Sequence, residues 1–109
     1  MQFRITKHIA INVRNYEKAI SFYRNTLGWE LIKKGIAESH FVKGDINFYI
    51  EENNEKPYEV FFEYEVDDIE AAKTKLLSEG CVVSQTYTPQ SIMFSDAYGM
   101  NFHVYQKGA

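Results

Sequence analysis

An internal repeat constrains the fold of this chain more than any other feature of its sequence. The stretch from Ile11 to Ala19 matches the stretch from Tyr64 to Ala72, which begins 53 positions later. Both stretches pass from an alternating strand pattern into an amphipathic helix. A supersecondary unit that cannot bury its own apolar face is expected to pack against a second copy. The repeat therefore predicts two similar modules.

The order of expected elements is the same in each half. In the first half the pattern predicts a helix that begins after Asn15 and ends at Gly28, with strands over 9–13, 29–33, 37–43 and 46–51. In the second half Asp67 and Glu70 resemble a capping box, Gly80 closes the helix, and strands are expected over 60–66, 82–87, 92–95 and 101–106. A polar segment over 53–57 separates the halves. We therefore expect an α+β fold of two βαβββ modules, about 1–52 and 58–109, in a single domain over 1–109.

Composition excludes several classes of protein and partner. The 109 residues suffice for one domain, and the net charge of -3 argues against nucleic acid as the main partner. No apolar run approaches about 18 residues and no apolar leader precedes the first strand, so we expect no membrane segment and a cytoplasmic protein. The single cysteine, Cys81, excludes an internal disulfide framework and a zinc site built on cysteines.

Aromatic residues are unusually frequent. They make up 16% of the chain, with eight Tyr and eight Phe, which is more than an ordinary core of this size needs. Small-molecule sites combine aromatic walls with a few polar groups. We therefore expect some of these rings to line a cavity.

Three stretches carry a resemblance to a known family. They are His8 to Val13, Ala19 to Trp29 with its Phe-Tyr-x-x-x-Leu-Gly pattern, and Phe94 to Phe102, where Ala97 stands in place of a common proline. With the repeat, they make the chain similar to the vicinal oxygen chelate superfamily of glyoxalases, bleomycin-resistance proteins and extradiol dioxygenases. The resemblance covers essentially the whole chain. It implies a curved mixed sheet around a cleft, and a homodimer in many short members.

Strand alternation predicts which side chains face away from the helices. In the first strand Ile9, Ile11 and Val13 should face the helix, and in the fifth strand Phe62, Tyr64 and Val66 should do so. The opposite face then carries polar and aromatic side chains, and we interpret these as the candidate ligand-binding residues: His8, Asn12, Tyr49, Phe61, Glu63, His103 and Tyr105.

The resemblance also implies four metal-ligand positions, which fall on His8, Tyr49, Phe61 and His103. Phe61 has no donor atom, and a phenol is a weak ligand, so His8 and His103 alone would bind a divalent ion loosely. Glu63 could complete a set of two histidines and one carboxylate. Otherwise the two histidines are hydrogen-bonded polar residues of the cleft, or they contact a ligand or move protons.

These patterns leave more than one function open. The first is a binding protein of the bleomycin-resistance type, a homodimer that holds a small organic molecule without a complete metal site and without another cofactor. The alternative is a metal-dependent lyase, epimerase, transferase or dioxygenase that uses His8 and His103, and a third is a structural or regulatory dimer. Acidic Glu63 and Glu65 would favour a cationic or hydroxylated ligand. Whether the chain is an enzyme, and whether its modules pair within one chain or between chains, stays open.

Overall fold

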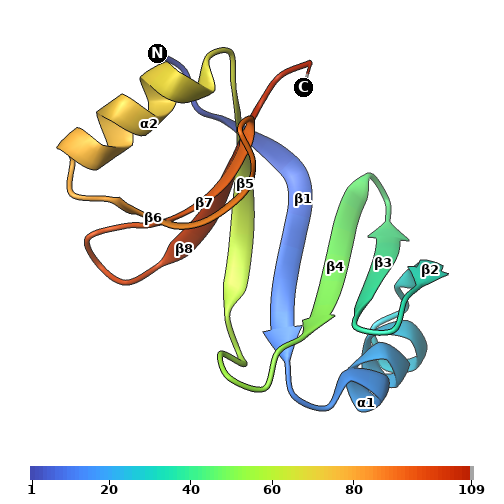
Figure 1. Cartoon of the computed structure of the whole chain (residues 1–109). Coiled ribbons are helices and arrows are strands. Elements are labelled where there is room, and N and C mark those ends of the chain that lie inside the picture. Colours follow the sequence, from blue (N-terminus) through green and yellow to red (C-terminus); the bar gives the residue numbers. More distant parts are fainter. Residues whose placement is uncertain (109) are drawn as a thin grey trace. The chain divides into compact units, whose positions relative to one another are not determined.

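A computed structural model describes residues 1–108 of the chain (Figure 1). It has two α-helices, one π-helical turn and eight strands, and in chain order these are β1 (Arg4–Val13), α1 (Tyr16–Ser21), η1 (Phe22–Thr26), β2 (Glu30–Lys34), β3 (Glu38–Lys43), β4 (Ile46–Glu52), β5 (Val60–Val66), α2 (Ile69–Ser78), β6 (Val82–Thr88), β7 (Ser91–Ser95) and β8 (Asn101–Gln106). Within residues 1–108, no helix is long and apolar enough to cross a membrane.

The predicted fold class is confirmed. The strands hydrogen-bond in the order β2-β3-β4-β1-β5-β8-β7-β6. The β1–β4 and β5–β8 pairs are parallel, whereas β2–β3, β3–β4, β6–β7 and β7–β8 are antiparallel. The sheet is therefore mixed, and each helix is followed by three strands, as the βαβββ pattern requires.

The chain divides into two compact units. One comprises Lys7–Val60, and the other comprises Met1–Thr6 together with the chain from Phe61 onward. Strand β1 contributes to both units, because its residues Arg4–Thr6 belong with the second half of the chain. Each unit is described by itself below.

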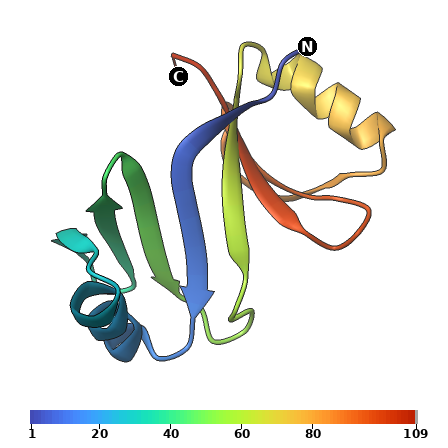
Figure 2. The same cartoon turned by 180° about the vertical axis from the view of Figure 1, so that it is seen from behind.

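The Lys7–Val60 unit has its own apolar core. The cluster of buried residues comprises Tyr16, Ile20, Phe41, Phe48 and Ile50. Alternate residues of β1 pack against it, namely Ile9, Ile11 and Val13, which confirms the predicted inward face of that strand. Figure 2 shows α1 beside the strands of this unit, with the β3–β4 hairpin in green.

The first helix differs from the sequence pattern. The sequence predicts one continuous α-helix that ends at Gly28, but α1 ends at Ser21 and a π-helical turn continues to Thr26. The Leu27 N–H donates to the Phe22 carbonyl, five residues back, over 3.2 Å, and Leu27 is 41% exposed. Asn15 precedes the helix, as predicted, but its side chain makes no capping hydrogen bond. Leu27, which follows the wider turn, therefore lies outside the core cluster of this unit.

A two-residue turn closes the β3–β4 hairpin between the two strands that the sequence predicts. Lys43 pairs with Ile46, so the turn consists of Gly44 and Asp45. Gly44 has a φ of +61°, and two-residue hairpins favour residues that tolerate this left-handed region. This turn fixes the register of the hairpin.

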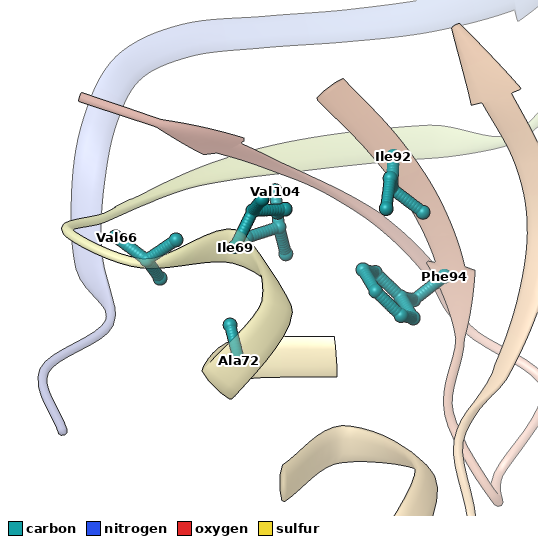
Figure 3. Packing of buried hydrophobic residues seen from close by; sticks show 6 residues of the cluster. All are labelled: Val66, Ile69, Ala72, Ile92, Phe94 and Val104. Carbon is teal, nitrogen blue, oxygen red and sulfur yellow. The ribbon is translucent and has the colours of Figure 1, made fainter. Parts of the chain in front are cut away.

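The other unit is built around α2 and four strands. Its core cluster comprises Val66, Ile69, Ala72, Ile92, Phe94 and Val104 (Figure 3). The predicted cap of α2 was wrong by one residue. Asp68, not Asp67, accepts hydrogen bonds from the N–H groups of Glu70 and Ala71, over 3.1 and 3.2 Å. Asp67 instead pairs with Arg4 over 2.9 Å.

One pair of residues in β5 reverses the expected burial. Phe62 was expected on the helix-packed face, but it is 48% exposed, whereas Phe61 is only 7% exposed. Tyr64 and Val66 do pack in the core with α2, as expected. The core cluster therefore covers the end of β5 and not its start, and alternation alone does not show where such coverage stops.

Candidate functional site

Three rings stack on the face of the Lys7–Val60 unit that looks away from its core. Tyr49 lies between His8 and His40, with ring centroids 5.6 and 4.6 Å away and interplanar angles of 9° in both cases. The strand register accounts for the closer pair, because His40 lies opposite Tyr49 in the β3–β4 ladder. The His40 Nε2 atom is also 2.7 Å from the Asn47 Oδ1 atom. Ring stacking and one polar contact therefore hold these three rings in place.

Polar side chains of β1, β4 and β3 form a row on the same face of the Lys7–Val60 unit as the stacked rings. Asn12 pairs with Glu51, and Glu51 pairs with Glu38 on the next strand. Burial raises the pKa of the Glu51 carboxyl, and the neighbouring Glu38 raises it further. Asn12 is 5% exposed, and its Nδ2 donates to the Lys56 carbonyl over 3.3 Å. Among the described residues, nothing donates to its Oδ1 atom.

The other unit brings together a histidine, a carboxylate and a hydroxyl group. The His103 Nδ1 atom is 2.9 Å from Glu63 Oε2, and its Nε2 atom is 2.6 Å from Ser91 Oγ. Glu63 and His103 are register partners on β5 and β8. The Thr6 hydroxyl donates to the other Glu63 oxygen over 3.0 Å. Three adjacent strands and the start of β1 therefore fix the imidazole.

A second network lies one step along the same strands. The Tyr105 hydroxyl donates to Glu65 Oε2 over 2.6 Å, and Arg4 donates to Glu65 Oε1 over 3.1 Å. The bond to Glu65 raises the pKa of Tyr105 to about 12. The same bond, with the help of Arg4, lowers the pKa of Glu65. At neutral pH Tyr105 is therefore a hydrogen-bond donor held on an ionised carboxylate.

The structure thus groups the predicted residues by unit. It brings Glu63, His103 and Tyr105 onto one face, and it stacks His8 on Tyr49 in the other unit. The His103 and Tyr105 rings stack at 6.5 Å between centroids. Phe61, which was expected to line a cleft, is buried.

Sequence reasoning missed two participants. His40 is not among the candidate residues that the sequence pattern indicates, although a two-residue turn after Lys43 places it opposite Tyr49. The strand that the sequence predicts over 92–95 does not include Ser91, which is the first residue of β7. Its contact with His103 is diagonal, because Ser91 pairs with Tyr105 in the ladder. No motif in the sequence signals such a diagonal contact.

The donor set does not fit a metal ion as it is arranged. Among residues 1–108, no three His, Cys, Asp or Glu side chains lie where they could hold one. Both ring nitrogens of His103 already lie within hydrogen-bond distance of Glu63 and Ser91. A metal at Nε2 would have to displace the Ser91 hydroxyl group.

Comparison with known proteins decides the family. The family model described as the Glyoxalase/Bleomycin resistance protein/Dioxygenase superfamily matches residues 5–104, which is most of the chain. The chain belongs to this superfamily. The predicted resemblance is therefore confirmed. A comparison with curated proteins found no match.

Solved structures of the superfamily share the fold. A superfamily member from Vibrio splendidus is 17% identical with a TM-score of 0.69, and the alignment covers 97% of this chain and all of that one. The Mn(II)-bound glyoxalase from Novosphingobium aromaticivorans is 17% identical with a TM-score of 0.73, over 99% of this chain and 41% of that one. Homoprotocatechuate 2,3-dioxygenase from Brevibacterium fuscum is 12% identical with a TM-score of 0.76, over 96% of this chain and 37% of that one.

These solved structures differ in how much of their own length this chain covers. This chain spans the whole of the Vibrio protein but about two fifths of the glyoxalase and of the dioxygenase. The TM-scores establish the shared fold, and at identities this low the comparison with these structures shows the fold alone. The superfamily architecture therefore occurs both at the length of this chain and within much longer chains.

Proposed function

We propose that this protein binds a small organic molecule on its polar and aromatic strand faces and that it does so without a complete metal site. The observation that carries the proposal is the face of β5 and β8, where His103, Glu63 and Tyr105 lie together with fixed hydrogen bonds. Side chains held in this way are preorganised, so little conformational entropy is lost when a ligand binds. The stacked rings of His8, Tyr49 and His40 offer a second surface of the same kind.

The charge of these faces favours one class of ligand. Glu63 and Glu65 lie on the β5–β8 face, and Glu38 and Glu51 lie on the face of the other unit. Carboxylates attract cations and accept hydrogen bonds from hydroxyl groups, and they repel anions. We infer that the ligand is an aromatic molecule that carries hydroxyl groups or a positive charge.

A matched pair of probes tests this selectivity. Dopamine and 3,4-dihydroxyphenylacetate share a catechol ring and differ in the charge of the side chain; the second is the substrate named for the Brevibacterium dioxygenase complex. Isothermal titration calorimetry should show that dopamine binds and that the anion binds several-fold more weakly. Tighter binding of the anion, or no binding of either probe, would contradict the proposal.

Variants then locate the binding surface. Glu63→Gln removes the carboxylate charge with little change in shape and should weaken dopamine binding by several-fold. Glu70→Gln makes the same change on the exposed first turn of α2 and serves as the control, with unchanged binding expected. Equal loss in both variants would show that only the net charge matters.

The alternative function is that of a metal-dependent enzyme. The observation that favours this alternative is the Mn(II) ion bound to the Novosphingobium glyoxalase. Incubation with Ni²⁺, Zn²⁺, Mn²⁺ and Fe²⁺, followed by measurement of bound metal, separates the two functions. Stoichiometric uptake that is lost in His8→Ala would favour the enzyme, and no uptake of any of these ions supports the binding protein.

We also propose that this protein is a homodimer in the cytoplasm. The dimer rests on the resemblance to short members of the superfamily, and the location rests on the composition of the chain. Sedimentation velocity of the purified protein tests the assembly. A single species with the mass of one 12.7 kDa chain would exclude the dimer.

A further inference from the structure

Ser91, His103 and Glu63 form a hydrogen-bonded chain across three adjacent strands. Ser91 is the first residue of β7, His103 lies on β8, and Glu63 lies on β5. The Ser91 Oγ to His103 Nε2 distance is 2.6 Å, and the His103 Nδ1 to Glu63 Oε2 distance is 2.9 Å. Each link is within the range of a hydrogen bond.

The chemistry of the three groups sets the direction of these bonds. An ionised carboxylate can only accept, so the bond to Glu63 places a proton on His103 Nδ1. In the neutral imidazole, Nε2 is then the acceptor, and the Ser91 hydroxyl donates to it. A hydroxyl that donates to an imidazole, which in turn donates to a carboxylate, is the arrangement that activates a serine nucleophile.

Neighbouring side chains keep the imidazole in this orientation. The Thr6 hydroxyl holds the second oxygen of Glu63. The Tyr87 ring meets the His103 ring edge-on, with 5.7 Å between centroids, and the Tyr105 ring stacks on it. The side chains of Glu63 and His103 are 19% and 21% exposed, so the group is sheltered and still open to solvent.

We propose that Ser91 is the nucleophile of an acyl-transfer activity toward small aryl esters, with His103 as its base and Glu63 as a positioning residue. Ser91 Oγ forms a bond to the ester carbonyl carbon, and its proton passes to His103 Nε2. The bond from that carbon to the leaving oxygen breaks, and the leaving phenol takes the proton from Nε2. Water then attacks the acyl group, Ser91 Oγ regains a proton through His103, and a carboxylic acid is released.

This activity goes beyond ligand binding and uses different probes. Acylation by an ester can occur whether or not dopamine binds, and dopamine can bind whether or not Ser91 reacts. The failure of either proposal is therefore visible separately.

The direct test is covalent labelling with p-nitrophenyl acetate. We expect an acetyl group on one residue of the intact protein, which peptide mapping assigns to Ser91, and release of p-nitrophenol in step with labelling. Ser91→Ala should abolish both signals. Labelling that persists in Ser91→Ala, or that is spread over lysine side chains, would overturn the proposal.

Ser95 offers a matched control on the same strand. It also lies on β7, two alternations from Ser91, but its hydroxyl group bonds to the Asn101 side chain and not to an imidazole. Ser95→Ala should leave the acetylation rate at Ser91 unchanged. An equal loss in both variants would show that the serines support the strand and do not react.

Separate measurements test His103 as the base and Glu63 as the positioning residue. His103→Gln should lower the acylation rate by about 100-fold, which is typical for loss of a general base. Glu63→Gln should lower it less, and the nitrogen NMR signals of the His103 ring should show that the proton is no longer confined to Nδ1. A normal rate in His103→Gln, or an unchanged ring tautomer together with a reduced rate in Glu63→Gln, would contradict these roles.

Discussion

At the scale of single residues, the Tyr105–Glu65 pair gives the clearest dependence on pH. The phenol pKa is raised from its ordinary value of 10.0 to about 12, so the folded protein holds this proton more tightly than the unfolded chain does. The stability that this provides is complete below pH 10.0 and is lost as the pH rises through about 12. The pKa of Glu65 is lowered from 4.5, so its contribution is complete above that pH and is lost as the pH falls further.

Spectrophotometric titration of tyrosine ionisation checks this pair. In the wild-type protein we expect one tyrosine, absent in Tyr105→Phe, to titrate near pH 12. In Glu65→Gln the same tyrosine should titrate closer to pH 10.0 because the hydrogen bond to an ionised carboxylate is lost. An unchanged titration in Glu65→Gln would show that Glu65 does not raise the phenol pKa.

Single residues also show which burials and contacts can be predicted from the sequence alone. Alternation correctly predicted that Ile9, Ile11 and Val13 face the core, because period-two patterns follow directly from strand geometry. It failed for Phe62, because burial also depends on what covers that part of the strand. The contact between Ser91 and His103 depends on side-chain directions across two strands, and residue spacing does not encode these.

At the scale of elements, the start of α2 is a sharp test of local structure. Asp68 accepts two hydrogen bonds from the first turn, so Asp68→Ala should lower the free energy of unfolding by about 1 kcal/mol. Asp67→Ala removes only an exposed ion pair with Arg4 and should have a smaller effect. Urea unfolding of both variants measures the difference. A larger loss in Asp67→Ala would place the cap where the sequence pattern alone predicted it.

The hairpin turn gives a second prediction about an element. Gly44 has a left-handed φ, and a Cβ atom at this position would meet nothing within 4 Å. Gly44→Ala should therefore cost about 1 kcal/mol of stability from backbone strain alone. Gly44→Asn should cost less, because asparagine tolerates this region better. Thermal unfolding of the two variants checks the order, and equal stability of all three proteins would contradict it.

The elements explain why secondary structure was the most predictable part of the fold. The turn at Gly44 and the strands β5 and β8 carry strong local signals, and their expected bounds agree with the structure. The π-helical turn after Ser21 has no such signal, because the sequence pattern that predicts the helix does not distinguish an α-helical from a π-helical turn. The C-terminal end of the first helix was therefore less predictable than the bounds of these strands.

At the scale of the whole molecule, strand β1 is divided between two compact units, and each unit has its own core. Phe41 lies in the core of the Lys7–Val60 unit and Phe94 in that of the other, and both are completely buried. Each change to alanine should cost about 3–5 kcal/mol. Because β1 supplies residues to both units, hydrogen exchange of β1 amides should become faster in both variants. Faster exchange of β1 in only one of them would show that the strand is stabilised by a single core.

The repeat predicted two modules of similar construction, and it did not predict how β1 is divided. Its match begins at Ile11, within the part of β1 that belongs to the Lys7–Val60 unit. Arg4 lies before the repeat, and its bonds to Glu65 and Asp67 join the start of the chain to β5. These long-range ion pairs have no counterpart in the repeat.

The central claim is that a small organic molecule binds on the face that carries Glu63, His103 and Tyr105. The most direct measurement is a titration of isotopically labelled protein with dopamine, followed by NMR of the backbone amides. The account predicts saturable shifts that are largest in β5 and β8 and that weaken in Glu63→Gln. Shifts confined to α2, or no saturable shift at all, would contradict it.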